Sequence, residues 1–464
     1  MDHYFYYFFG KLVTHLRNNV YKALYDRELS MFSIYLFHFI WPVTLPEQRQ
    51  AHILFLGHFH NLEVTINMDN INNPVQPGKI KSGNLWVLDD FNPELILNDI
   101  LRLNLNTVNV PIHVDIPSRT SLTMTINEAQ KQKAVELIEV LTGKGIQVML
   151  EPFPFIQGGQ FGETEWNPAD KKRWFMLWQT TVLNPLINTI ANPYQVWGLN
   201  IASNLVNFES MEADWDAMIE ETRRQLGGNV VLRTNWWYTA SWSPQTQQAF
   251  TTKINRSYWK LVDFISIDAW FELNNQAVPS VEQIKSSMTS TEVYNRKQNI
   301  LQEIQRFHEV TGKDIYFGGF NIPALEYGLK FPWNEAVSPV KSPAVQANGW
   351  TAYKEMLEDL SYFLGFSVWV IGNNDPEYSY RVEPETALVI HDWYYDDTCS
   401  EKELEELRKE LETLQGEMNH LQEQIEELEL ERGQWLVREG ELINRIEDQQ
   451  QILNEIKRLI DNGA

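Results

Sequence analysis

Short apolar runs alternate with helical patterns along the chain between Lys81 and about Tyr395. Each run has the length and composition of a β-strand, and each is followed by a segment with the apolar spacing of a helix. The run from Gln195 to Ala202, for example, passes through a turn of small residues into a helical pattern at 209–224. Eight strands are predicted in this way: Leu85 to Leu88, Thr107 to His113, Gln147 to Glu151, Gln195 to Ala202, Val230 to Asn235, Phe264 to Asp268, Ile315 to Phe320 and Gly365 to Ile371.

Eight strands spaced by helices predict an α/β fold, a (β/α)8 TIM barrel, over residues 81–397. In such barrels the functional side chains lie at the carboxyl ends of the strands. The residues predicted there are polar or aromatic: Asp89, Asp90, His113, Asp115, Glu151, Asn204, Asn235, Trp236, Trp237, Asp268, Trp270, Asn321 and Trp369. Any one of them alone is more often structural. A purely structural barrel does not need the whole ring, so we predict a carbohydrate-binding cleft.

The segment before the barrel has a different pattern. Residues 1–30 predict a helix with an aromatic start, and residues 46–78 contain two short alternating runs and a turn-rich linker. We interpret residues 1–80 as a small helical and β-containing attachment module, whose function the pattern does not indicate. The apolar window from Met31 to Leu45 is short for a membrane span and contains His38 and Pro42, so a buried segment is expected.

The last segment, 398–464, carries the heptad spacing of a coiled coil. Its apolar positions alternate steps of three and four: Leu404, Leu407, Leu411, Leu414, Met418, Leu421, Ile425 and Leu428, and then Leu442, Ile446, Leu453, Ile456 and Ile460. Arg432, Trp435 and Glu439 interrupt the seam, beside Gly433 and Gly440. A parallel dimer or trimer is favoured because the register resumes in phase, while a helical hairpin folding back near Gly433 is the alternative.

Composition narrows the range of partners. A net charge of -24, without a basic stripe, argues against nucleic acid and against an anionic membrane surface. Cys399 is the single cysteine, which excludes an intrachain disulfide and a cysteine-based metal site. We therefore predict no cofactor and no metal. The chain has 17 Trp, 18 Tyr and 23 Phe, a surplus of flat rings that suits stacking on sugars as well as core packing.

Several stretches of the predicted barrel form a recognisable set: 144–152, Gly162-Glu163 with the following Trp174-Phe175, Ile201-Ala202-Ser203-Asn204-Leu205 with Trp215, Thr234-Asn235-Trp236, 261–271 and 313–321. Together these stretches resemble glycoside hydrolase family 113, a group of β-mannanase-like retaining enzymes with a (β/α)8 fold. The most specific is Asp263-Phe264-Ile265-Ser266-Ile267-Asp268-Ala269-Trp270. The resemblance implies the barrel fold and a sugar substrate.

The resemblance also implies two catalytic carboxylates, which this sequence lacks. Retaining glycosidases place two carboxyl groups about 5 to 5.5 Å apart, as acid/base and nucleophile. The resemblance implies that one carboxylate belongs to a Glu after strand four and the other to a Glu after strand seven. The matching positions in this sequence are Asn204 and Gly319. No Asp or Glu lies between Leu199 and Phe208 or between Ile315 and Ala324. The family's mechanism cannot operate with an amide and a glycine.

Other acids remain in the predicted cleft. The resemblance implies that Glu163 and Asp268 position substrate or support structure. A relocated catalytic pair, for example Glu151 with Glu165, is an alternative that requires two simultaneous replacements. The predicted carbohydrate-binding residues are Glu151, Glu163, Asn204, Asn235, Trp236, Asp268, Trp270, Asn321 and Trp369.

We therefore expect a carbohydrate-binding barrel, derived from a glycosidase, on an oligomerising coiled coil. By analogy of architecture, such a protein resembles a bacteriophage tail fibre or baseplate appendage that recognises host cell-surface polysaccharide or teichoic acid. Its expected partners are cell-surface carbohydrate, copies of itself and other virion tail proteins, and its expected location is the virion. An active glycoside hydrolase with displaced carboxylates and a purely structural virion protein are the alternatives.

Overall fold

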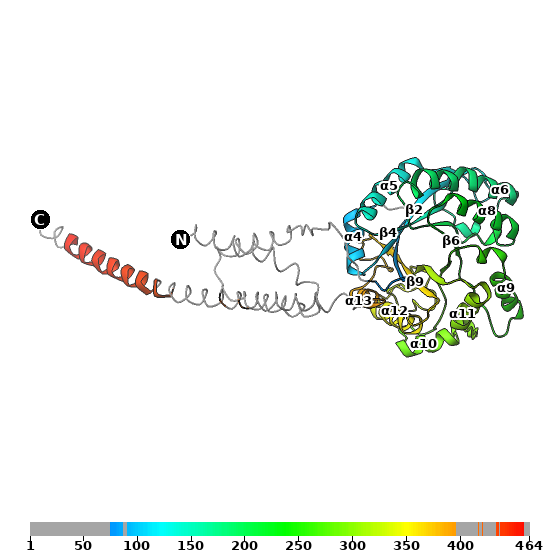
Figure 1. Cartoon of the computed structure of the whole chain (residues 1–464). Helices are drawn as coiled ribbons and strands as arrows, with labels where there is room; N and C mark the ends of the chain where they lie inside the picture. The colour runs from blue at the N-terminus through cyan, green and yellow to red at the C-terminus, as the bar shows by residue number, and fades with distance from the viewer. Residues whose placement is uncertain are drawn as a thin grey trace. The chain divides into compact units, whose positions relative to one another are not determined.

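The computed structural model describes residues 75–86, 91–395, 416, 420, 433–435 and 437–458, and within them it confirms the predicted barrel. Eight parallel strands form a closed ring because β1 pairs with both β2 and β9 (Figure 1). A short strand, β3, runs antiparallel to β2. The strands are β1 Ile80–Leu85, β2 Thr107–Ile116, β3 Thr125–Ile126, β4 Gln147–Ile156, β5 Gly198–Ser203, β6 Asn229–Thr234, β7 Ile265–Asp268, β8 Ile315–Phe320 and β9 Phe363–Ile371.

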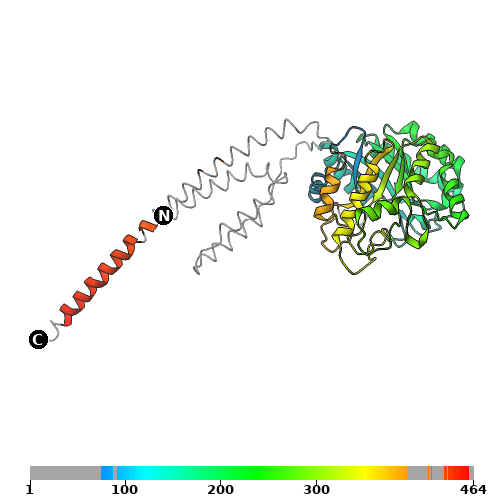
Figure 2. The ribbon, with the colours of Figure 1, turned by 90° about the horizontal axis from the view of Figure 1, so that it is seen from below.

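Helices encircle the strands, as the two views in Figures 1 and 2 show. The α-helices are α4 Pro93–Arg102, α5 Glu128–Gly143, α6 Lys171–Leu177, α7 Asn184–Leu186, α8 Glu212–Gln225, α9 Pro244–Ile254, α10 Val281–Thr289, α11 Ile300–Thr311, α12 Pro343–Leu357 and α13 Pro384–Asp392. Local sequence explains their ends. Ser280 and Gln283 form a capping box at the start of α10, and Gly312 ends α11 with a φ of 68°.

Part of the aromatic surplus fills the core between the strands and α6 and α8. Trp166, Trp174, Trp178 and Phe208 are fully buried, and the Trp174 ring lies 4.3 Å from Phe208 between centroids. Trp215 of α8 joins the cluster at 6.2 Å from Trp174. These rings stabilise the wall of the barrel by burial and edge-to-face packing, so they are not available to a ligand.

The first strand was predicted wrongly. The prediction placed it at Leu85 to Leu88, whereas β1 ends at Leu85. Polar residues hid the strand in the sequence: Lys81, Ser82 and Asn84 are all buried. Hydrogen bonds make this possible, since Lys81 Nζ donates to the His391 carbonyl at 2.7 Å and Asn84 donates to the Gly318 carbonyl at 2.9 Å.

Other strand boundaries also move. β2 and β4 continue past their predicted ends at His113 and Glu151, which places Glu151 inside β4 rather than at its end. The two strands pair in continuous parallel register from Thr107 with Gln147 to Ile116 with Ile156, which is why they are longer. β5 begins at Gly198, later than the predicted Gln195.

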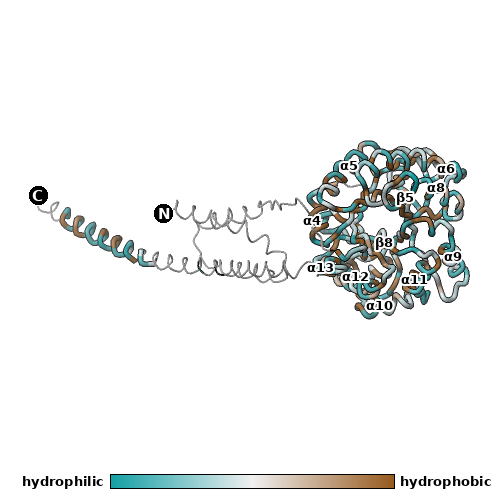
Figure 3. Tube along the Cα trace, in the orientation of Figure 1, coloured by the Kyte–Doolittle hydropathy of each residue, from teal (hydrophilic) through white to brown (hydrophobic). Residues whose placement is uncertain are grey.

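The barrel forms one compact unit within 66–396, and the tail is separate from it. The predicted attachment module at 1–80 lies outside the described residues up to 74, as do Asp89 and Asp90. In the tail, 437–458 is helical, and Figure 3 shows hydrophobic and hydrophilic positions intermixed along it. Leu442, Ile446, Leu453 and Ile456 are all exposed. The coiled coil stays a prediction.

Candidate functional site

The carboxyl ends of the strands form one face of the barrel, which we call the mouth. Arg233, near the end of β6, contacts Glu151 of β4 and Asp268 of β7 there. Its Nη2 lies 2.7 Å from Glu151 Oε2 and its Nε lies 3.7 Å from Asp268 Oδ1. The side chains of all three residues are buried. A guanidinium buried this deeply requires carboxylate partners, because desolvation of an unpaired charge is costly. Sequence reasoning missed Arg233, although an Arg directly after the apolar run Val230 to Leu232, inside a predicted strand, was a usable signal.

Glu151 is fully engaged by its neighbours. Besides the ion pair with Arg233, its Oε1 accepts a hydrogen bond from Ser203 Oγ at 2.5 Å. Ser203 in turn accepts from Asn200 Nδ2 at 2.7 Å. These contacts hold Glu151 as a structural carboxylate that fixes Arg233 and the end of β5.

Asp268, at the end of β7, contacts both positions at which the family resemblance places catalytic carboxylates. Asn204 Nδ2 donates to Asp268 Oδ2 at 2.5 Å. On the other side, a Cβ added to Gly319 would lie 2.4 Å from Asp268 Oδ1. A side chain at 319 therefore requires Asp268 to move. One carboxylate, bonded to an amide, fills the space between the two positions.

Burial raises the pKa of Asp268 to about 6. The Arg233 guanidinium and the Asn204 hydrogen bond act in the opposite direction, and the Glu151 charge adds to the rise. Because burial outweighs the stabilising partners, Asp268 exchanges its proton in the range of neutral and mildly acidic solutions.

Glu163 lies in the short turn Glu163–Glu165 that follows Gly162, and it is half-buried. Burial raises its pKa to about 7, and the charges of Asp268 and Glu151 raise it further against the effect of Arg233. The turn is anchored by Asn207, whose amide donates to the Thr164 carbonyl at 2.9 Å. The mouth thus contains two acids, Glu163 and Asp268, that titrate near neutral pH and influence each other.

Glu165 is placed differently. Its side chain is 45% exposed and forms an ion pair with Arg119 at 3.3 Å. Glu151 and Glu165 are thus held by different arginines, so the relocated catalytic pair suggested from the sequence gains no support from their surroundings. The acids brought together by the fold are Glu151, Glu163 and Asp268.

Aromatic side chains line one side of the mouth. Trp369 in β9 packs edge-on against Trp86 at 5.4 Å and against Trp270 at 6.4 Å between ring centroids. Trp270 also contacts Tyr380 at 5.5 Å. Trp86 and Trp369 are half-buried, whereas Trp270 is 9% exposed. Trp86 and Tyr380 were missed because neither follows a predicted strand end.

The remaining predicted binding residues differ in what they can offer a ligand. Trp236 and Asn235 are half-buried, and Asn235 Oδ1 has no hydrogen-bond partner among the described residues. Asn321 is fully buried. Its Nδ2 donates to the Trp369 and Tyr380 carbonyls, and its Oδ1 accepts from Trp350 Nε1 and from the next backbone N–H. All four hydrogen bonds of the amide are used, so Asn321 supports β9 and has no free group for a sugar.

Two predicted strand-end residues on β2 are also occupied. His113 is buried and stacks on Phe155 at 4.7 Å between centroids. Asp115 accepts a hydrogen bond from Asn127 Nδ2 at 3.0 Å, which joins β2 to the start of α5. Both residues therefore stabilise the wall of the barrel.

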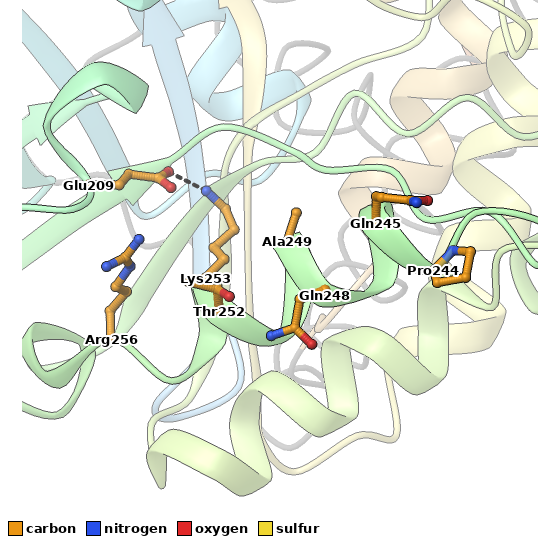
Figure 4. A pocket seen from close by; sticks show the side chains of 8 residues that line it. All are labelled: Glu209, Pro244, Gln245, Gln248, Ala249, Thr252, Lys253 and Arg256. Carbon is orange, nitrogen blue, oxygen red and sulfur yellow. Dashed lines mark hydrogen bonds and ion pairs between the residues drawn. The ribbon is translucent and has the colours of Figure 1, made fainter.

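An open pocket of about 720 Å³ lies elsewhere, beside α9, and its lining is drawn in Figure 4. Glu209 and Lys253 form an ion pair there, and Arg256 pairs with Glu212 at 2.9 Å. None of the strand-end residues predicted from the sequence lines this pocket. Its charged groups are all engaged in ion pairs, which makes the barrel mouth the better candidate site.

In the part of the chain that the structure describes, the His, Cys, Asp and Glu side chains include no group of three or more arranged to hold a metal ion. Within the same residues, no helix has the length and apolarity needed to cross a membrane.

Comparisons with known proteins give the family and the fold. The sequence model of Glycoside Hydrolase Family 113 matches residues 102–380. A solved GH113 β-1,4-mannanase complex is similar with a TM-score of 0.52 at 15% identity, covering 70% of this chain and 99% of that one. The GH113 β-mannanase AaManA from Alicyclobacillus acidocaldarius, in complex with ManMIm, has a TM-score of 0.51 at 13% identity, covering 69% and 97%. No curated protein sequence matches. At these identities the structural likeness establishes the fold alone.

Proposed function

Since this chain belongs to glycoside hydrolase family 113, we propose that its barrel binds a carbohydrate chain at the mouth without the family's double displacement. The observation that carries the proposal is the Asp268 carboxylate, which accepts from Asn204 and fills the space beside Gly319. The family's two carboxylate positions therefore hold no pair of acids. What remains is a mouth of hydrogen-bonding groups and tryptophans, a composition suited to sugars.

The ligand class follows from the relatives and from the chemistry of the mouth. The similar solved proteins are described as β-1,4-mannanases, so β-1,4-linked mannan is the first ligand to test. Host cell-wall polysaccharide or teichoic acid is the second ligand to test, because we propose, by analogy of architecture, that the protein acts at a bacterial surface.

The tail supports a multivalent arrangement. Exposed Leu442, Ile446, Leu453 and Ile456 leave an apolar seam on 437–458 that a second helix can cover. Two or three barrels on one stalk raise the avidity of a weak sugar site without new contacts. We extend the proposal to an oligomeric bacteriophage tail fibre or baseplate appendage, bound to other virion tail proteins; this step is analogy from architecture.

One experiment tests binding and catalysis together. The full chain is incubated with mannan and, separately, with purified bacterial cell-wall polysaccharide, and both retention and new reducing ends are measured. We expect the wild-type chain to be retained on the polymer without producing new reducing ends. Trp236→Ala or Trp270→Ala should weaken this retention, whereas Trp242→Ala, at an exposed ring, should leave it unchanged. Circular dichroism of each variant checks that the fold persists. Absence of retention on both polymers contradicts the proposal and favours a purely structural virion protein.

A second candidate function is glycoside hydrolysis by a displaced pair of acids. The observation that favours it is the raised pKa of Glu163, about 7, next to that of Asp268, about 6, because a general acid must carry its proton near the working pH. In this case new reducing ends appear with the wild-type chain. They are lost in Glu163→Gln and in Asp268→Asn, and they persist in Glu165→Gln, whose side chain pairs with Arg119.

A further inference from the structure

Three strongly exposed aromatic rings lie outside the mouth, in loops far apart in sequence. Tyr238 follows β6, Tyr294 lies between α10 and α11, and Trp333 follows β8. Their exposed fractions are 54%, 59% and 48%. Exposed rings of this size are costly to solvate, and a gathering of several indicates a binding surface.

A single arginine holds these rings together. The Arg296 guanidinium lies 4.6 Å from the centre of the Tyr238 ring and 4.9 Å from that of Tyr294. The same guanidinium forms an ion pair with Glu272, whose Oε1 accepts a hydrogen bond from Trp333 Nε1 at 3.2 Å. The side chains of Arg296 and Glu272 are only 14% and 10% exposed. A nearly buried ion pair thus fixes rings that are open to solvent, which lowers the entropy cost of binding.

The backbone of this loop adds a second, independent observation. Tyr294, Asn295 and Lys297 all have positive φ, at 51°, 51° and 54°. Left-handed backbone at non-glycine residues is strained and persists only where surrounding contacts impose it. Strain of this kind, used to present an exposed Tyr294 beside Arg296, points to a functional loop.

The exposed rings continue the aromatic side of the mouth. Tyr380, which contacts Trp270 at 5.5 Å, donates its hydroxyl to the Pro332 carbonyl at 2.6 Å. Pro332 stands between Phe331 and Trp333. The Phe331 ring lies 5.9 Å from Trp333 and 6.4 Å from Tyr294 between centroids. Ring contacts on either side of the Tyr380–Pro332 hydrogen bond therefore connect the barrel mouth to the outer loops.

We propose that Tyr238, Tyr294 and Trp333, supported by the Arg296–Glu272 pair, form an outer glycan-binding surface. It takes the pyranose rings of a polysaccharide that continues out of the mouth, with apolar sugar faces on the aromatic rings and hydroxyls toward the polar rim. This inference rests on the proposed carbohydrate-binding function. Continuity with the mouth favours a glycan over a protein partner, whose contacts would not need to follow the aromatic side of the cleft.

Ligand length provides the test. The full chain is titrated by calorimetry with two ligands. One is β-1,4-linked mannobiose, a short ligand expected to occupy the mouth alone, and the other is mannohexaose, a longer one expected to extend to the outer surface. The double variant Tyr294→Ala/Trp333→Ala is expected to bind mannohexaose roughly tenfold more weakly and to bind mannobiose unchanged. Leu388→Ala, which removes a side chain of similar exposure from α13, away from these loops, leaves both affinities unchanged. Trp270→Ala is expected to weaken the binding of both ligands.

The outcomes separate this inference from the function on which it rests. If Trp270→Ala weakens both sugars while the double variant binds mannohexaose as the wild type does, the mouth binds glycan and the outer surface does not. If the wild type binds neither sugar, both proposals fail. If the double variant changes only the sedimentation mass, the surface is a protein contact and the glycan assignment is overturned. Melting curves of each variant confirm that the exposed positions tolerate alanine.

Discussion

The Asn204 amide donates a 2.5 Å hydrogen bond to the Asp268 carboxylate, and the opposite oxygen of that carboxylate lies where a side chain at 319 would begin. Asn204 and Gly319, the two positions at which the family resemblance places catalytic carboxylates, are therefore parts of one arrangement. An amide can donate to a carboxylate, whereas a second carboxylate at 204 would repel it. The glycine leaves room for Asp268 to hold its position.

A double-mutant cycle between Gly319 and Asp268 measures this coupling. Gly319→Ala is expected to lower the free energy of unfolding by roughly 1 to 3 kcal/mol, because its Cβ overlaps Asp268 Oδ1. In an Asp268→Ala background, where the carboxylate is gone, the same change is expected to cost little. Urea unfolding of the four proteins gives the interaction energy. An equal cost in both backgrounds would show that Asp268 does not occupy the space beside Gly319.

The pKa shifts predict how stability depends on pH. Asp268 moves from its ordinary 3.8 to about 6, and Glu163 moves from 4.5 to about 7. An acid with a raised pKa binds more protons in the folded than in the unfolded chain, so the free energy of unfolding falls as pH rises from about 4 to about 7. For Asp268 the fall is at most about 3 kcal/mol.

Unfolding midpoints measured between pH 4 and pH 8 check this dependence. Asp268→Asn and Glu163→Gln each remove one titrating group, so each is expected to flatten part of the curve. Glu165→Gln, at an exposed ion pair, serves as the matched control and should leave its shape unchanged. A wild-type protein that becomes steadily more stable over this range would contradict the assignment.

Arg233 is expected to be the most sensitive residue of the mouth. Arg233→Met leaves Glu151 without its ion-pair partner in a buried site, a change that costs about 3 to 5 kcal/mol in stability. Arg233→Met/Glu151→Gln removes both charges and should recover part of that loss. Guanidinium unfolding of the single and double variants measures the recovery. Strictly additive effects would mean that the pair is not coupled.

Much of the barrel could be predicted because its apolar strand spacing is regular. The exception is β1, where Lys81, Ser82 and Asn84 are buried and hydrogen-bonded. Such a strand has no apolar alternation, since its polar groups find partners on other strands that the local sequence does not reveal. Boundaries of β2 and β4 failed for a related reason, because their length is set by mutual pairing.

The mouth could be predicted as a set of residues but not as an arrangement. Asn204, Glu163 and Asp268 were identified from strand ends and from the family resemblance, and the fold brings them into one charged cluster. Which carboxylates pair, and with which arginine, depends on distances across the barrel. The outer surface of Tyr238, Tyr294 and Trp333 around Arg296 was not predicted at all, because its rings come from three separate loops.

The tail offers a prediction that does not depend on the mouth. Leu453 is 64% exposed on the helix at 437–458 and occupies a seam position of the heptad pattern. If the seam joins copies of the chain, Leu453→Asp buries a charge in each interface and should dissociate the oligomer. The mass of the full chain measured by sedimentation equilibrium is then expected to fall from a multiple of 54.4 kDa to 54.4 kDa. Gln450→Ala, an exposed polar position on the same helix, is the control and should keep the oligomer. A wild-type chain that sediments as a monomer would instead favour the hairpin, in which the seam is covered within one chain.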